Sequence, residues 1–126
     1  MRYLLDTTFV IDHLRGVEAA RYRFRELVED GDEPLVNDIV TCEAWAGARA
    51  STDPDLEALL RFVEFVQPGP ETARLAGRWR AESRSRGRTL NVADALIAAA
   101  AESLGAAVLT RNVRDFALTP VRVETY

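Results

Sequence analysis

The N-terminal segment constrains the fold more than any other part of the chain. Tyr3–Leu5 is an apolar run too short for a helix, and the polar residues Asp6–Thr8 follow at once. An apolar run that ends abruptly at polar residues is typical of a buried parallel strand. A helix is predicted over Phe9–Leu14, with Thr7 or Thr8 as N-cap and Gly16 after its end. Asp6 is therefore expected either at the ligand-binding carboxyl edge of a sheet or as a helix cap.

The rest of the chain extends this start into one α/β pattern. Further strands are expected at Pro34–Val40, Ala107–Leu109 and Val121–Glu124. Helices are expected at Glu18–Asp30, from Thr41 to Gly47, from Asp53 toward Val66, at Glu71–Arg86 and between Asn91 and Gly105. This alternation predicts a three-layer α/β/α sandwich with a central, mostly parallel sheet of four to five strands. At 126 residues, the chain is expected to form a single domain, residues 1–126.

Composition excludes several functional classes. All 16 basic residues are arginines, which excludes P-loop nucleotidases, phosphotransfer receivers and haloacid-dehalogenase-like phosphatases, because these require a lysine. The single Cys42 excludes an intrachain disulfide and suits a reducing compartment. Asp6 and Asp12 interrupt the N-terminal apolar stretch, so a secretory signal is not expected. The longest uncharged apolar run, Ala95–Ala101, is too short to cross a bilayer. We expect a cytoplasmic protein without membrane association.

Acidic side chains recur where predicted strands end and helices start. Glu43 is expected in the first turn or so of its helix, Asp94 in the first turn of its own, and Asn112 or Asp115 after the strand that ends at Leu109. Each acid alone has an ordinary explanation, such as matching a helix dipole. Together they place three or four carboxylates at one sheet edge, where their repulsion is costly unless a cation lies between them. Oxygen ligands without a Cys or His cluster favour Mg²⁺ or Mn²⁺ over zinc.

Three other features leave alternatives open. A basic cluster could hold phosphates by bidentate bonds or could be a solvated face, and it consists of Arg78, Arg80, Arg84, Arg86 and Arg88. The helix Asp55–Val66 is apolar over more than half of its circumference, which predicts either a dimer interface or burial inside the monomer. His13 is expected to be a solvated or capping residue rather than a catalyst.

Four motifs, taken together, resemble those of PIN domains, and in particular of the VapC-type toxins of type II toxin–antitoxin pairs. They are Leu5–Thr8, Glu43, Asp94–Ala98, and Thr110–Asn112 with Asp115–Phe116. The resemblance extends over essentially the whole chain. It implies a PIN-like fold and an endoribonuclease that depends on Mg²⁺ or Mn²⁺. It also implies a homodimer silenced by a cognate VapB-type antitoxin, in a heterotetramer or larger complex, with an antitoxin arginine reaching the acidic pocket.

The resemblance also assigns roles to residues. Asp6 and Asp94 would be the metal ligands, and Glu43 would complete the acidic pocket. The fourth position of the pocket falls on Asn112, and Asp115 could either substitute for it or only orient the loop. The hydroxyls of Thr7 and Thr110 would hold water or a phosphate oxygen. Apart from the resemblance, the charge of the arginines suits RNA phosphates, which could be bound by the cluster Arg78, Arg80, Arg84, Arg86 and Arg88, or by Arg111 and Arg114. Transfer RNA and ribosomal RNA are both compatible substrates. The alternative is a catalytically weak or inactive PIN-like domain that binds RNA or a protein.

Overall fold

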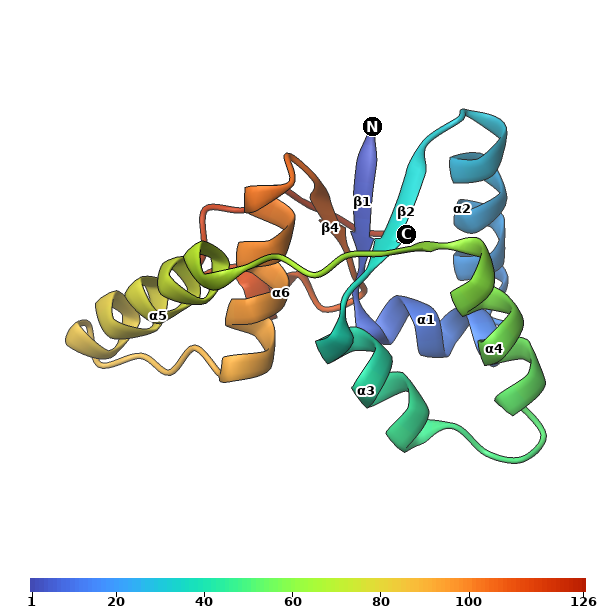
Figure 1. Ribbon diagram of the computed structural model, residues 1–126, viewed down its shortest axis with the longest axis horizontal. Coiled ribbons are helices and arrows are strands. Elements are labelled where there is room, and N and C mark those ends of the chain that lie inside the picture. Colours follow the sequence, from blue (N-terminus) through green and yellow to red (C-terminus); the bar gives the residue numbers. More distant parts are fainter.

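A central sheet separates two groups of helices in the computed structural model, which describes all residues from Met1 to Tyr126 (Figure 1). The strands are β1 (Arg2–Leu5), β2 (Glu33–Val36), β3 (Glu64–Phe65), β4 (Ala107–Leu109) and β5 (Val123–Glu124). The helices are α1 (Thr7–Leu14), α2 (Glu18–Glu29), α3 (Asp38–Gly47), α4 (Asp53–Phe62), α5 (Pro70–Ser85) and α6 (Val92–Ser103), with a 3₁₀ turn η1 at Val113–Phe116. None of these helices is long and apolar enough to cross a membrane.

The sheet is entirely parallel, which confirms the predicted fold class. Its strand order is β3-β2-β1-β4-β5, so β1 lies in the middle, with β2 and β4 as its neighbours. Leu4 of β1 is opposite Leu35 on one side and Val108 on the other, and all three side chains are fully buried. Because all strands run in the same direction, their carboxyl ends meet at one edge of the sheet.

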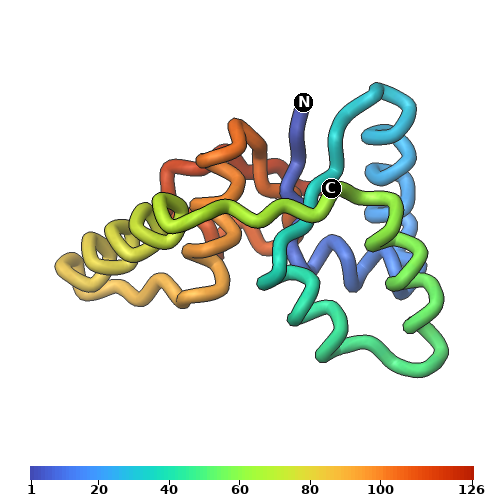
Figure 2. The backbone as a smooth tube through the Cα atoms, viewed as in Figure 1, coloured from blue at the N-terminus to red at the C-terminus, as the bar shows by residue number.

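Helix α6 is the buried helix that the sequence predicted. Its buried side chains are mostly alanines, which allow a helix to lie close against a sheet. Asn91 is its N-cap, as expected, because the Asn91 side chain accepts a hydrogen bond from the backbone N–H of Asp94. Helix α5 packs on α6, and its C-terminal end (yellow) points away from the sheet before the chain returns to α6 (Figure 2).

The predicted strand Pro34–Val40 is wrong in its second half. Strand β2 ends at Val36, and α3 begins at Asp38 rather than at Thr41. Asn37 explains the change, because its side chain accepts a hydrogen bond from the N–H of Val40 at 3.0 Å and so starts the helix early. Glu43 consequently lies in the second turn of α3 and not in its first.

The long apolar helix expected up to Val66 is also wrong. Helix α4 ends at Phe62, and the short strand β3 follows and pairs with β2. Val63 and Val66, which flank β3, are buried in the core. The apolar excess that suggested a second buried helix face therefore belongs partly to a strand. Phe62 and Phe65 remain exposed, at 59% and 44%.

Candidate active site

Asp6 follows the central strand and is held by two hydroxyls. It occupies the N-cap position of α1, where Thr7 or Thr8 was expected, but its side chain makes no capping hydrogen bond. Its Oδ2 instead accepts the hydroxyl protons of Thr110, at 2.7 Å, and of Thr8, at 3.1 Å. Asp6 is only 5% exposed. These contacts exclude the capping alternative, and they orient a buried carboxylate whose Oδ1 has no donor.

Asp94 lies in the first turn of α6, as predicted, and its carboxylate is in an unfavourable environment. Burial is the main cause that raises its pKa, to about 6, and the negative charge of Asp115 is the second. Asp6 and Glu43 raise the pKa further, while the amide of Asn91, which donates to Asp94 Oδ2 at 2.7 Å, opposes them. Four acids from distant segments therefore lie close enough to interact.

Glu43 reaches the same region from α3. Its side chain is exposed, and its Oε1 accepts a hydrogen bond from the hydroxyl of Thr7 at 2.8 Å. Since Thr7 is the first residue of α1, the contact joins α3 to the turn that carries Asp6. The dipole-matching acid in the first turn of α3 is Asp38, so the ordinary explanation considered for Glu43 does not apply.

The segment after β4 supplies a backbone contact and a carboxylate. The N–H of Asn112 donates to Thr110 Oγ1 at 2.9 Å, which fixes the hydroxyl that holds Asp6. Asp115 lies in η1, where its N–H donates to the carbonyl oxygen of Asn112 at 3.0 Å. Of these two candidates for the fourth position, Asp115 is the one whose charge acts on Asp94.

No basic side chain neutralises these acids. Asp6, Glu43, Asp94 and Asp115 take part in none of the ion pairs of the molecule. No three His, Cys, Asp or Glu side chains are arranged to hold one metal ion. Mg²⁺, however, is usually bound by one or two carboxylates together with water and substrate phosphates. The all-oxygen donors and the unpaired charges fit such an ion.

The predicted substrate-binding residues have varied surroundings. The hydroxyls of Thr7 and Thr110 both donate to site carboxylates. Arg80 donates from Nε to the carbonyl oxygen of Leu90 at 3.0 Å, which fastens the loop after α5. The other members of the basic cluster are exposed, namely Arg78 in the middle of α5, Arg84 in its last turn, and Arg86 and Arg88 just after it. A role of these residues in binding RNA stays a prediction.

A polar network adjoining Thr8 was not predicted from the sequence. Asp12 is 3% exposed, and both of its oxygens accept from Arg111 Nη1, at 2.7 and 2.8 Å. The hydroxyl of Tyr126 also donates to Asp12 Oδ2, at 2.7 Å. An acid three residues after Phe9, on the apolar side of a short helix, was the available signal, because a buried carboxylate requires a partner. The sequence does not show that this partner is 99 residues away.

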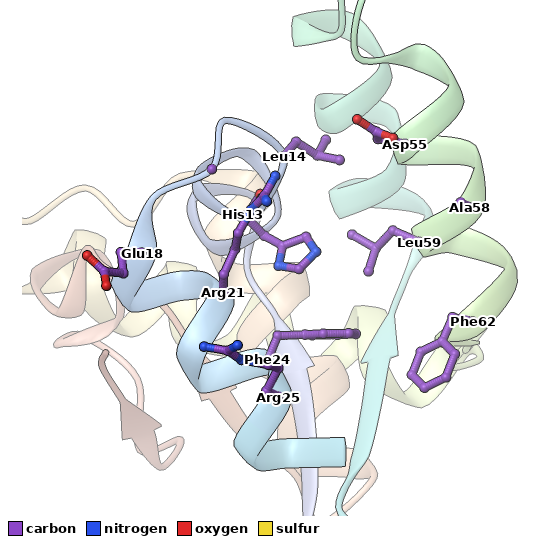
Figure 3. A pocket seen from close by; sticks show the side chains of 11 residues that line it. His13, Leu14, Glu18, Arg21, Phe24, Arg25, Asp55, Ala58, Leu59 and Phe62 are labelled. Atoms are coloured by element: carbon purple, nitrogen blue, oxygen red, sulfur yellow. The ribbon is translucent and has the colours of Figure 1, made fainter. Parts of the chain in front are cut away.

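The largest cavity is a separate groove between α1, α2 and α4, of about 800 Å³ (Figure 3). None of the four site acids lines it. His13 does, and it is half-buried, whereas a solvated or capping residue was expected. Its ring packs against Phe9 and Phe24, its Nδ1 is buried without a hydrogen-bond partner, and burial lowers its pKa.

Comparison with known families identifies the class of this protein. The PIN domain matches residues 3–120, which is nearly the whole chain and contains every site acid. The chain therefore belongs to the PIN-domain family.

Individual relatives narrow this similarity to the VapC proteins. The chain is 39% identical to ribonuclease VapC19 of Mycobacterium tuberculosis over 117 residues, which cover 93% of this chain and 94% of VapC19. Its fold is similar to that of a chain of VapBC2 from Rickettsia felis, which was solved with a promoter DNA fragment. The TM-score is 0.87 at 22% identity, and the match covers 100% of this chain and 99% of that chain. For a chain of VapBC-1 from nontypeable Haemophilus influenzae, the TM-score is 0.82 at 25% identity, and the match covers 99% of this chain and 98% of that chain.

Proposed function

We propose that this protein is a metal-dependent endoribonuclease that hydrolyses RNA phosphodiester bonds with Mg²⁺ or Mn²⁺, and that residues 1–126 act as one nuclease domain. The observation that supports this most is that four acids from distant segments lie close together and take part in no ion pair, which also raises the pKa of Asp94 beyond the effect of burial. Such charge accumulation is unfavourable for a purely structural site. The similarity to a protein named ribonuclease VapC19 agrees with the proposal.

In this proposal, Asp6 and Asp94 hold the cation, and Glu43 and Asp115 complete the acidic pocket. The hydroxyls of Thr8 and Thr110 keep Asp6 Oδ2 in place, so that Oδ1 is free for a ligand. A bound divalent cation supplies Lewis acidity and activates water for attack on the phosphate. Without a cation, the unpaired carboxylates repel the RNA backbone, so that RNA binding at the site requires the metal.

RNA cleavage by the purified protein tests this function. We expect the full chain to cut single-stranded RNA with Mg²⁺ or Mn²⁺ and to stop cutting when EDTA is added. Asp94→Asn removes a proposed ligand and is expected to lower the rate at least 100-fold. Asp30→Asn, which changes an exposed acid at the end of α2, is the matched control and should cut normally. If stoichiometric wild-type protein cuts no RNA with either metal, the alternative is the better explanation, namely an inactive PIN-like domain that binds RNA or a protein.

We propose that the partner of this nuclease is a VapB-type antitoxin in the cytoplasm and that an apolar antitoxin segment occupies the groove between α1, α2 and α4. In support, the groove presents Phe24, Leu59 and the exposed Phe62 between charged rims, among which are Arg21 and Asp55. The similar folds of two proteins whose structures are titled VapBC agree with such a partner. A homodimer, and a heterotetramer or larger complex with the antitoxin, stay predictions.

Substitution in the groove tests the partner. Phe62→Glu should weaken binding of the co-expressed antitoxin at least tenfold, because a charge then enters the apolar groove. Phe65→Glu is the control, since Phe65 is similarly exposed but lies outside the groove. Equal affinity of the two variants for the antitoxin would contradict this placement, and light scattering on the same samples gives the oligomeric state.

A further inference from the structure

A hydrogen-bonded chain joins the C-terminal residue to the proposed metal ligand Asp6. Tyr126 donates to Asp12, and Asp12 accepts twice from the Arg111 side chain. The backbone N–H of Arg111 is 3.3 Å from Thr8 Oγ1, and Thr8 in turn donates to Asp6 Oδ2.

The pair formed by Asp12 and Arg111 is unusual among the ion pairs of this protein. Asp12 has a side chain only 4% exposed, whereas the Arg111 side chain is 56% exposed. Only Nη1 of the guanidinium contacts Asp12, so Nε and Nη2 have no protein acceptor. Arg111 is thus fixed at one nitrogen and offers its other donors to solvent.

Stability alone does not explain this arrangement. Removing a carboxylate from water is costly, and an apolar residue in place of a buried ion pair is often neutral or stabilising. The arrangement does hold the Arg111 guanidinium in one position. An arginine held at one nitrogen loses little conformational freedom when its remaining donors bind a phosphate. Arg111 also directly follows Thr110, whose hydroxyl holds Asp6.

We propose that Arg111 binds a phosphate of the RNA strand next to the acidic site, and that buried Asp12 and the C-terminal Tyr126 position it for this contact. This inference rests on the proposed ribonuclease function and names a residue that grips its substrate. Arg111 supplies a positive charge on the loop after β4, directly after the residue whose hydroxyl holds Asp6, where the site acids would otherwise repel the strand. Tyr126 is a positioning residue, since it acts through Asp12.

RNA affinity in a non-cleaving background tests the proposal. The probe is a fluorescently labelled single-stranded RNA of 20 nucleotides, bound to the full chain carrying Asp94→Asn at several salt concentrations. Mg²⁺ is held at one constant concentration, high enough to offset the weaker metal binding expected of this variant. Arg111→Gln is made together with Asp12→Asn, so that no unpaired charge stays buried. We expect a five- to twentyfold loss of affinity and a salt slope lower by about one ion. Arg61→Gln is the matched control, because Arg61 is an exposed arginine paired with Glu57 at 3.0 Å on α4.

A second pair of variants keeps the test decisive if the double variant does not fold. Arg111→Lys retains the charge, so it should keep the salt slope but lose affinity. Tyr126→Phe retains the ring that packs edge-on against Phe9 at 5.0 Å and removes only the hydroxyl. It should raise KM two- to fivefold in the cleaving protein without changing kcat, and leave the salt slope unchanged.

The outcomes separate this inference from the proposed function. Unchanged RNA affinity in the Arg111 variants, or a loss equal to that of Arg61→Gln, would overturn the role of Arg111 even if the wild-type protein cleaves RNA. An Arg111-dependent loss of affinity supports it even if the wild-type protein cleaves none. A Tyr126→Phe variant with lower kcat and unchanged KM would overturn the positioning role.

Discussion

The chemistry of this protein depends on how individual carboxylates are oriented, and Asp6 shows this most clearly. Its place after the central strand was predictable from the apolar run before it. The two hydroxyls that hold it were not, because Thr110 is 104 residues away and the fold brings it to Asp6. Asp94 was equally predictable from its helix start. The pairing of Asp12 with Arg111 was missed for the same reason as the Thr110 contact.

Loss of the Thr110 hydroxyl should impair cleavage. Thr110→Val has nearly the same shape, and Thr110 is fully buried, so the main changes are the loss of the 2.7 Å bond to Asp6 and of the acceptor for the Asn112 N–H. We expect a rate at least tenfold lower and a loss of stability of about 1–2 kcal/mol. The check is RNA cleavage alongside urea unfolding. An unchanged rate in a folded Thr110→Val variant would show that this hydroxyl does not position Asp6 for catalysis.

The raised pKa of Asp94 makes the metal-free protein sensitive to pH. The folded state binds the Asp94 proton more tightly than the unfolded state, whose pKa is near 3.8, while the folded value is about 6. The Asp94 contribution therefore lowers the free energy of unfolding as pH rises from about 4 to 6, and because the side chain is partly exposed, solvent screening limits this loss to about 1 kcal/mol. Asp94→Asn should remove this part of the pH dependence and stabilise the protein at pH 7 in EDTA. A variant less stable than wild type at pH 7 in urea unfolding would contradict this.

At the scale of elements, the sequence located every helix and four of the five strands. The two wrong predictions are the end of the second strand and the end of α4, where polar and apolar residues alternate over only a few positions. Asn37 starts α3 early because its side chain caps the helix, although the following Ile39 and Val40 continue an apolar strand pattern. Strand β3 has only two residues, both exposed, so its own sequence carries no strand signal, and its pairing with β2 determines it.

The close fit of α6 against the sheet gives a prediction at this scale. Ala98 is fully buried, so Ala98→Leu forces extra atoms into a filled core and should destabilise the protein by about 1–3 kcal/mol. Ala73→Leu, at an exposed position of α5, should change stability by less than about 0.5 kcal/mol. Chemical unfolding of both variants measures the difference. Equal stabilities would mean that α6 does not need small side chains.

At the scale of the whole molecule, charge is separated between two regions. The acids lie after β1, in α3, at the start of α6 and in η1, while the basic cluster lies along the second half of α5 and the loop after it. The net charge is −4, so any RNA affinity must come from local basic groups. The sequence could predict both clusters but not their separation, which depends on the direction of α5.

Neutralising the projecting cluster tests whether it contributes to RNA binding. Changing Arg84, Arg86 and Arg88 to Gln should weaken RNA binding at low salt and lower the salt slope by up to about three ions. The fold should be unaffected, because these side chains are exposed and none of them forms an ion pair. Fluorescence anisotropy across a salt series gives the slope. An unchanged slope would show that the cluster is a solvated face.

Calorimetric titration of the metal-free protein with Mn²⁺ tests the central claim most directly, since it requires no knowledge of the RNA. Wild-type protein should show saturable binding, and Asp6→Asn and Asp94→Asn should each weaken it at least tenfold. The Asp30→Asn control should bind like wild type. If wild-type protein binds neither Mn²⁺ nor Mg²⁺, or if Asp6→Asn and Asp94→Asn bind as tightly as wild type, the acids do not form a metal site and the account is wrong.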